Sequence, residues 1–488
     1  MSAPNSLGER PVPPRRGFAG RGGGRVSWVA APPEWRGTTA QVCGLWPFAG
    51  GAGSPMVGVP VGRDLRTGET VCSDPISWFQ RAGLILNPSV LVMGRPALGK
   101  STLVRRMATG LAAYGILPIV AGDTKPDYVD LVIAMGGHVV NLARGQGTLN
   151  PLDPGAALAA ARQLTGTARR RLLADAHGRR VTMVSALVTM NRQAAVSDVE
   201  EAVIAACLDV LDEHHTESPA TLVEMLEVLS EGPEAVRRLT LDRGDDGRYR
   251  AAVHGLESSI AALLQGAMGD TFAHPTSTPV NVNGPLCIDI SGIPDSDAKL
   301  KVAVLLACWG ETFGALAAAQ ALADAGKAPP RLWFIVLDEL WRVLRSGPGL
   351  VERVDSLTRL NRQEGVGMAL VIHTLKDLVS LTSEEDRTKA KGFAERVGYL
   401  AIGGVPAGEV PLIQDVVALS GPEAELLAHW ADPPGWDVRA GREADPPGRG
   451  KFLLKVGGKA GIPIQLQMVD AERHVHDTNK RWHTRAGD

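Results

Sequence analysis

The chain has 488 residues, with 51 basic and 53 acidic side chains and a formal net charge of −2. This balance excludes a global electrostatic field that would draw the protein to nucleic acid or to an anionic membrane, so any basic surface must be local. The length suggests roughly two to four domain-sized units. The five cysteines are scattered and form no CxxC pair, which argues against a disulfide framework and against a zinc knuckle.

No targeting or membrane-spanning segment is recognisable in the sequence. The N-terminus has charges and prolines but lacks the apolar stretch of a signal peptide. The most apolar long stretch, from Val302 to Ala325, carries Glu311 and Asp324 and has the spacing of an amphipathic helix. We therefore expect a cytoplasmic protein without a membrane span.

Residues 1–55 are rich in glycine, proline and arginine and cannot bury enough apolar surface to fold alone. This composition favours a disordered tail over an RGG-like arm that binds nucleic acid. Trp28, Trp35 and Trp46 also lie here, and indoles in a tail often dock on another surface, such as the body of the same protein.

A phosphate-binding loop is predicted between a strand and a helix. The segment Gly94–Ser101 matches GxxxxGK[ST], follows the apolar run Ser89–Met93 and precedes a helix-forming segment. Glycines let the backbone wrap an anion, and the N–H groups at the start of a helix point at the phosphates. Lys100 is expected to contact the β- and γ-phosphates, and Ser101 to bind Mg²⁺. The residues expected to bind nucleotide are Gly94, Arg95, Pro96, Ala97, Leu98, Gly99, Lys100, Ser101 and Thr102.

An acidic pair follows another apolar strand, Trp333–Leu337. At the end of that strand, Asp338 is placed to hold Mg²⁺ directly or through water, and Glu339 to orient and deprotonate the attacking water. Alone, such a pair is more often the N-cap of a helix, and it is the phosphate loop that favours a catalytic role. Since 338 minus 101 is 237 residues, a large insertion must separate the two halves of the sheet.

Near-continuous apolar strands alternate with helix-patterned segments, which predicts an α/β fold with a mostly parallel sheet covered on both faces. Further strands are expected at Leu117–Gly122, Leu286–Ile290 and Met368–Ile372, and a C-terminal β-hairpin at Phe452–Val456 and Ile462–Met468. The expected organisation is a disordered segment at 1–55, the first part of the core at 56–150, a helical insertion at 151–280, the second part of the core at 281–470 and a polar tail at 471–488.

Several further sequence blocks occur in a fixed order. Val120–Tyr128 contains a strand followed by the turn Asp-Thr-Lys-Pro-Asp-Tyr, which is similar to the turn Asp-Pro-Lys-Gly-Glu-Tyr of the protein family named below. The other blocks are Gly136-Gly137, Leu149–Asp153, Cys287–Ile290, Leu337–Trp341, Arg359–Gln363 and His373-Thr374. Over roughly residues 56–470 the chain resembles the FtsK/HerA superfamily of ring ATPases, and within it the VirB4/TraC branch of type IV secretion and conjugation ATPases.

The resemblance implies a RecA-like P-loop NTPase with an additional strand, ATP and Mg²⁺ as ligands, a hexameric ring, and membrane-embedded secretion or conjugation partners. It makes Arg362 the first candidate and Arg359 the second for an arginine that acts on a neighbouring subunit's nucleotide; the alternative is a solvated helix end. His373 and Thr374 are candidate γ-phosphate sensors, and the alternative is a buried histidine satisfied by the backbone. The chain departs from the family pattern in two places, because Gln363 stands where a lysine is usual and no glutamine ends the sensor strand.

Asp123 and Lys125 form a weaker site prediction, since they could face the nucleotide or the subunit boundary, or form only a turn. About 90 residues precede the phosphate loop, which suggests a motor module rather than a complete secretion ATPase. Two other functions stay open: a DNA translocase or coupling protein of the FtsK/HerA type, and a non-hydrolysing nucleotide-binding scaffold. DNA is therefore an open partner, and association with the inner face of the cell membrane is expected only through partners.

Overall fold

The computed structural model describes residues 56–143, 145–215, 218–352, 354, 365–381, 383–437, 442–443 and 445–475. The chain divides into two units, residues 1–50 and residues 51–488, and all described residues belong to the second. The expectations for residues 1–55, for Arg359 and for Arg362 therefore lie outside the described residues, as does most of the tail at 471–488.

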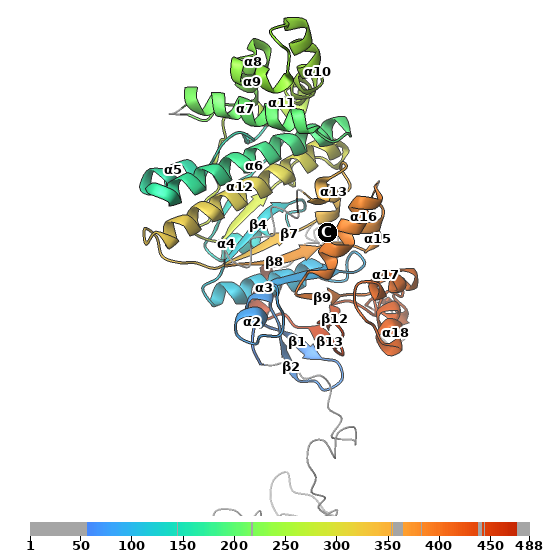
Figure 1. The fold of residues 1–488 in the computed structure, drawn as a ribbon. Helices are drawn as coiled ribbons and strands as arrows, with labels where there is room; N and C mark the ends of the chain where they lie inside the picture. Colours follow the sequence, from blue (N-terminus) through green and yellow to red (C-terminus); the bar gives the residue numbers. More distant parts are fainter. Residues whose placement is uncertain are drawn as a thin grey trace, which may run out of the picture. The chain divides into compact units, whose positions relative to one another are not determined.

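One large sheet organises the described residues (Figure 1). Its strands are β1 (Pro60–Asp64), β2 (Thr70–Cys72), β3 (Ser89–Met93), β4 (Leu117–Asp123), β5 (His138–Asn141), β6 (Leu286–Asp289), β7 (Trp333–Leu337), β8 (Val366–Val371), β9 (Tyr399–Ile402), β12 (Lys451–Lys455) and β13 (Ile462–Leu466). They are ordered β2-β1-β13-β12-β9-β3-β8-β7-β4-β6-β5. From β9 to β5 all neighbours are parallel, which confirms the mostly parallel sheet expected from the sequence.

The other edge of the sheet is antiparallel and joins segments far apart in the sequence. β12 and β13 form the C-terminal hairpin that the sequence predicted, and β12 pairs with β9 while β13 pairs with β1. β1 and β2 form a second hairpin, which was not predicted from the sequence. A separate small hairpin joins β10 (Trp436–Asp437) to β11 (Arg442–Glu443).

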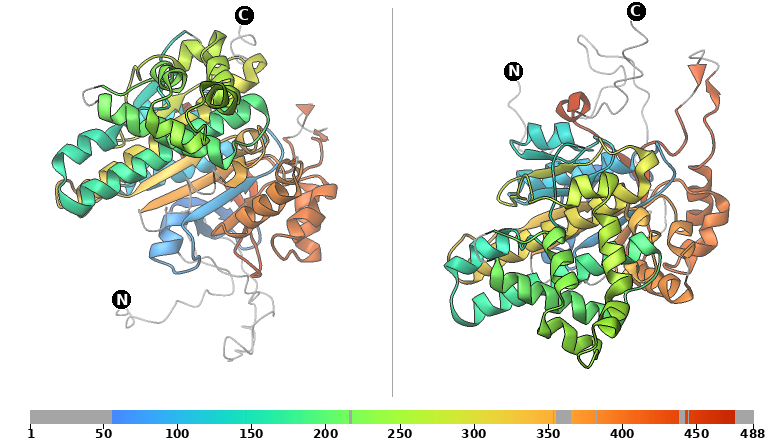
Figure 2. Two further views of the ribbon diagram at one scale, coloured as in Figure 1. Left: turned by 45° about the horizontal axis from the view of Figure 1, so that its top comes forward. Right: turned by 90° about the horizontal axis from the view of Figure 1, so that it is seen from above.

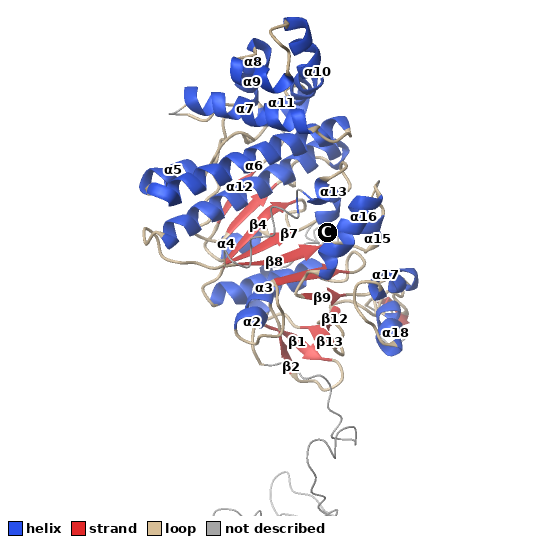
Figure 3. Cartoon of the chain, in the orientation of Figure 1, coloured by secondary structure: helices blue, strands red, loops and turns tan. Residues whose placement is uncertain are grey.

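Helices cover both faces of the sheet (Figure 3), as buried parallel strands require. Successive side chains of a strand point to opposite faces. In β3, Val90 and Val92 belong to the hydrophobic core beneath α2 (Pro75–Gln80), α3 (Lys100–Ala113) and α4 (Val129–Ala134). Leu91 and Met93 belong to the larger core on the face covered by α12 (Ala298–Asp324). The phosphate-loop strand is thus fixed from both sides.

Helices occupy the chain between β5 and β6 (Figure 2). Their bounds are α5 (Ala156–Gln163), α6 (Gly166–Arg192), α7 (Asp198–His214), α8 (Leu222–Glu231), α9 (Glu234–Thr240), α10 (Asp246–Leu263) and α11 (Gly266–Phe272). Capping boxes at Ser197 and Thr221 satisfy the first N–H groups of α7 and α8. An alanine-rich cluster packs α5 and α6 against α12. The limits of this region as a separate subdomain stay a prediction.

The long helix α12 is the apolar core helix of the described residues. By length and composition alone, the segment Asp295–Asp324 could cross a membrane, but 72% of its most apolar window is buried inside the protein. The amphipathic pattern expected for this stretch is wrong for its first half, where every residue from Leu300 to Trp309 is buried. The reason is that α6 covers one side of this half and β4 lies against the other, as the approach of Gly122 in β4 to Leu305 shows, whereas α5 packs farther along the helix near Ala318.

Short helices follow the carboxyl ends of the strands and complete the fold. They are the 3₁₀ turns η1 (Asp295–Asp297) and η2 (Ala407–Glu409), with α13 (Leu340–Leu344), α15 (Lys376–Val379), α16 (Glu384–Glu395), α17 (Val410–Gln414), α18 (Gly421–His429) and α19 (Asp470–Val475). Because β3, β7 and β8 are parallel, the starts of α3, α13 and α15 meet at one edge of the sheet.

Gly122 in β4 is required by both its backbone and its surroundings. Its φ is +127°, and an added Cβ would lie 2.5 Å from Cδ2 of Leu305 in α12. We expect Gly122→Ala to lower the free energy of unfolding by about 2–4 kcal/mol through backbone strain and overpacking. Gly136→Ala is the matched control, because its φ of +74° is strained but nothing lies within 4 Å of the added carbon. Urea denaturation compares the two variants, and equal losses would contradict the packing argument.

Candidate nucleotide site

The loop between β3 and α3 has the backbone conformation that a phosphate loop needs. The φ angle is +147° at Gly94, +64° at Ala97 and +100° at Gly99. Glycine adopts such values readily, whereas they cost an alanine conformational energy. The first N–H groups of α3 have no acceptor within the helix and point out of its N-terminal end toward the loop. An anion bound in the loop would satisfy them.

Neighbouring strand ends hold the loop in place. The N–H of Gly94 donates to the carbonyl of His373 at 3.1 Å, and the N–H of Arg95 donates to the carbonyl of Gly404 at 2.9 Å. The Arg95 side chain donates from Nη1 to the carbonyl of Ala431 at 2.6 Å. His373 follows β8 and Gly404 follows β9, so the loop is anchored to both strands that flank β3.

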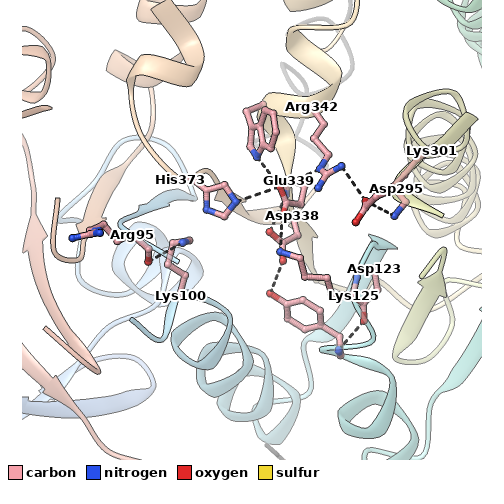
Figure 4. Close-up of polar contacts among 12 residues, drawn as sticks. Arg95, Lys100, Asp123, Lys125, Asp295, Lys301, Asp338, Glu339, Arg342 and His373 are labelled. Atoms are coloured by element: carbon pink, nitrogen blue, oxygen red, sulfur yellow. Dashed lines mark hydrogen bonds and ion pairs between the residues drawn. The ribbon is translucent and has the colours of Figure 1, made fainter. Parts of the chain in front are cut away.

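Lys100 begins α3 with its ammonium folded into the loop (Figure 4). Only 7% of the residue is exposed, and Nζ donates to the carbonyls of Gly94 at 2.7 Å and Arg95 at 3.2 Å. Burial lowers the pKa of Lys100 to about 8, while the negative charges of Asp338 and Glu339 oppose this shift. The ammonium therefore lies within the field of the acidic pair that the sequence assigned to the same site.

The acidic pair lies one strand away from the phosphate loop. β8 pairs with β3 on one side and with β7 on the other, so the additional strand stands between the loop and the acids. Glu339 has a φ of +54°, which turns the chain sharply from β7 into α13. Its N–H donates to Oδ1 of Asp338 at 2.8 Å. The turn thus directs both carboxylates to the edge of the sheet where the phosphate loop ends.

Donors from several elements surround the Glu339 carboxylate. Its Oε1 accepts from Nζ of Lys125 at 3.1 Å. Its Oε2 accepts from Nε1 of Trp341 at 2.6 Å and Nε of Arg342 at 3.4 Å, and lies 3.5 Å from Nε2 of His373. Burial alone would raise the pKa of Glu339, but His373 and Lys125 hold it well below its usual range. In this state Glu339 is a fixed carboxylate.

The side-chain oxygen atoms near the loop are of the kinds that bind magnesium. Burial, aided by the charge of Glu339, raises the pKa of Asp338 to about 6, and Ser101 makes a side-chain hydrogen bond with Asp127. Hydroxyl and carboxylate oxygens suit Mg²⁺, which also keeps waters and phosphate oxygens as ligands. In the part of the chain that the structure describes, no three or more His, Cys, Asp or Glu side chains form a metal site by themselves.

The two sensor candidates have different surroundings. His373 contacts Glu339, and among the described residues its buried Nδ1 has no hydrogen-bond partner. The N–H and Oγ1 of Thr374 donate to Oδ2 of Asp377 at 3.1 and 3.2 Å, so this hydroxyl is engaged in its own turn. The structure therefore brings His373 to the acidic pair and directs the Thr374 hydroxyl toward α15.

The turn Asp123–Tyr128 after β4 reaches both halves of the site. Asp123 accepts the N–H of Tyr128 at 2.8 Å and the N–H of Lys125 at 3.3 Å, which fixes the turn. The Tyr128 hydroxyl lies 3.5 Å from Oδ2 of Asp338. In the same turn, Asp127 contacts the serine of the phosphate loop and Lys125 the glutamate of the acidic pair.

Sequence reasoning missed four side chains that line this site: Asp127, Tyr128, Trp341 and Arg342. All four lie inside or next to sequence blocks that the resemblance had already singled out. Their positions in or beside these blocks could therefore have marked them as site residues. Their contact partners could not be predicted, because they depend on how β4 and β7 are aligned in the sheet.

Nucleotide binding is expected to weaken in alkaline solution. Because the pKa of Lys100 is about 8, its ammonium loses its proton as the pH rises from 7 to 9. Binding of an ATP analogue without metal should weaken about tenfold over this range, since only the charged form attracts phosphate. Lys100→Arg keeps its charge and is the control. An equally steep profile for that variant would assign the titration to another group.

Comparison with known proteins bears on the fold. No protein-family model matches the chain, and no curated protein matches it in sequence. Among solved structures, VirB4 of Thermoanaerobacter pseudethanolicus matches at a TM-score of 0.62 and 18% identity, covering 86% of this chain and 100% of that one. This chain has the VirB4 fold.

The VirB4 fold is the fold expected from the sequence, a RecA-like P-loop architecture with a mostly parallel sheet, and it is confirmed. Plasmid coupling protein TrwB, in complex with an ATP analogue, matches at a TM-score of 0.48 and 12% identity, covering 78% of this chain and 86% of that chain. The cytoplasmic domain of the Thermomonospora curvata type VII secretion ATPase EccC matches at 0.33 and 17% identity, covering 87% of this chain and 30% of that chain. These two superpose too loosely to add to the VirB4 match.

Proposed function

We propose that this protein is an ATP-hydrolysing motor of a conjugative transfer or type IV secretion system. The observation that carries the proposal is the convergence of Lys100 and the pair Asp338 and Glu339 on one edge of a VirB4-type sheet. A loop that binds phosphate through backbone N–H groups, a buried ammonium and two carboxylates together make the parts that phosphoryl transfer to water needs.

In the proposed reaction Lys100 binds the β- and γ-phosphates and moves from the loop carbonyls to phosphate oxygens. Ser101 and Asp338 would hold Mg²⁺, which when bound neutralises charge on the phosphates. Glu339 orients water for in-line attack on the γ-phosphorus and takes its proton, while the bond from that phosphorus to the β–γ bridging oxygen breaks and ADP leaves. One of the Glu339 oxygens now bonded to donors must therefore become available. His373 lies beside Glu339 and is proposed to respond to the γ-phosphate.

The resemblance also supports a hexameric ring in which Arg362, or second Arg359, reaches the nucleotide of a neighbouring subunit. Membrane-embedded secretion or conjugation components are the proposed partners. They would recruit the protein from the cytoplasm to the inner face of the membrane. The division into two core parts, with a helical insertion at 151–280 and terminal segments at 1–55 and 471–488, belongs to the same proposal.

A DNA translocase or coupling protein is the alternative motor, and a non-hydrolysing scaffold is the alternative without turnover. The steady-state ATPase rate against protein concentration, with and without long double-stranded DNA at low salt, separates them. The proposed motor predicts a rate that rises with self-association and is indifferent to DNA. Strong stimulation by DNA would favour the translocase, and ATP binding without turnover at any concentration would favour the scaffold.

A further inference from the structure

We propose that Lys125 acts as a latch on Glu339: its ammonium binds the Glu339 carboxylate in the nucleotide-free protein and moves to the γ-phosphate when ATP binds. This inference rests on the proposed function and adds a positioning residue that couples arrival of the γ-phosphate to release of the base. The contact that carries it joins Nζ of Lys125 to Oε1 of Glu339 at 3.1 Å.

The two oxygens of Glu339 are held differently. Trp341 and Arg342 donate to Oε2, and His373 lies 3.5 Å from it. Lys125 donates to Oε1 instead. Among the recorded contacts of the described residues, Lys125 is the one donor on Oε1. If the Lys125 ammonium left, the contacts at Oε2 would still hold the carboxylate in position. Oε1 would then be free to accept a hydrogen bond from water. Removal of the other donors would instead loosen the position of the side chain.

Lys125 is also the partner that can move. Its side chain is 59% exposed, while that of Glu339 is 4% exposed. An ion pair with one well-solvated partner is weakly held, and phosphate oxygens compete well for an ammonium. The backbone beneath Lys125 is fixed, because Asp123 accepts N–H groups at both ends of the turn. The exchange therefore needs a rotation of one side chain and no movement of the loop.

The destination of the ammonium lies close by. The side chains of Lys100 and Lys125 lie in the same site as the acidic pair Asp338 and Glu339 (Figure 4). Asp127, in the same turn, contacts Ser101 of the phosphate loop. A γ-phosphate held by Lys100 would thus enter the space between the two lysines, where a second cation is attracted to it.

Nucleotide binding tests the latch without relying on hydrolysis. Dissociation constants are measured for the Mg²⁺ complexes of the non-hydrolysable ATP analogue ADPNP and of ADP. We expect Lys125→Met to weaken ADPNP binding about threefold to tenfold and to leave ADP binding within about twofold, because only ADPNP carries the γ-phosphate. Lys125→Arg should keep most of the difference in affinity between ADPNP and ADP. Lys376→Met is the matched control, since Lys376 is 57% exposed and binds the 2% exposed Glu409 in the same manner.

A double-mutant cycle separates the latch from a general effect of charge. Glu339→Gln frees Lys125 and should tighten ADPNP binding, and this gain should disappear in the Lys125→Met background. A gain that persists in that background, or an equal loss of ADPNP and ADP affinity in Lys125→Met, would overturn the latch. Wild-type protein that binds neither nucleotide would instead overturn the proposed function, so the two failures are distinguishable.

Discussion

We expect Glu339→Gln to lower the turnover number for ATP hydrolysis by at least about a hundredfold while the protein still binds ATP. Glutamine has nearly the same volume, and its oxygen can still accept from Trp341 and Arg342, so the turn into α13 should persist. The amide cannot take a proton from water, which removes the chemical role and keeps the position. Phosphate release and equilibrium nucleotide binding, measured on the same preparation, check both parts of the expectation.

Glu409→Gln is the matched control for this variant. Glu409 is as well buried as Glu339 and also binds a lysine, Lys376 at 3.2 Å, but it has no assigned role at the phosphate loop. Its hydrolysis rate should stay within about twofold of wild type. If Glu339→Gln hydrolysed ATP as fast as wild type, the assignment of Glu339 as the general base would be wrong.

Lys100→Met should weaken nucleotide binding by at least about a hundredfold and abolish hydrolysis at ordinary ATP concentrations. Methionine fills the space of the buried stem but cannot donate to phosphate. The carbonyls of Gly94 and Arg95 lose their present donor and lie on a loop that is partly exposed, so water can replace it. We therefore expect little change in stability. The shift of the thermal unfolding midpoint on adding Mg²⁺–ADPNP should be present in wild type and absent in Lys100→Met.

Lys455→Met is the contrasting variant, because it changes another buried lysine. Lys455 is 2% exposed and binds the Glu423 carboxylate at 2.9 Å, so its removal leaves a charge without its partner. This variant should lose stability and keep its affinity for nucleotide. If Lys100→Met bound ADPNP as tightly as wild type, the phosphate-loop assignment would be wrong, whatever its stability.

Local patterns predicted the parts of the fold that are fixed locally. The strand Ser89–Met93, the loop that follows it and the strand before Asp338 were predictable because each is a short apolar run with a motif attached. The mostly parallel sheet followed from the alternation of such runs with helices. The hairpin β1–β2 was not predicted, because it is short and lies at the antiparallel edge with a register shift between Pro60 and Gly62.

Contacts between distant segments were beyond the reach of the sequence. Lys125 and Glu339 are 214 positions apart, and only the parallel pairing of β4 with β7 brings them together. The weak prediction for Asp123 and Lys125 could therefore not specify a partner. The burial of α12 was also predicted wrongly: its charged residues suggested an amphipathic helix, although α6 and β4 enclose its first half. The roles of Arg359 and Arg362 stay predictions.

Single-turnover hydrolysis of γ-labelled ATP by excess wild-type protein tests the central claim most directly. The account predicts that bound ATP is cleaved to ADP and phosphate in the presence of Mg²⁺, with cleavage lost in Glu339→Gln and binding lost in Lys100→Met. Tight binding of ATP with no cleavage by the wild-type protein, in a preparation that self-associates, would contradict a motor built on Lys100, Asp338 and Glu339.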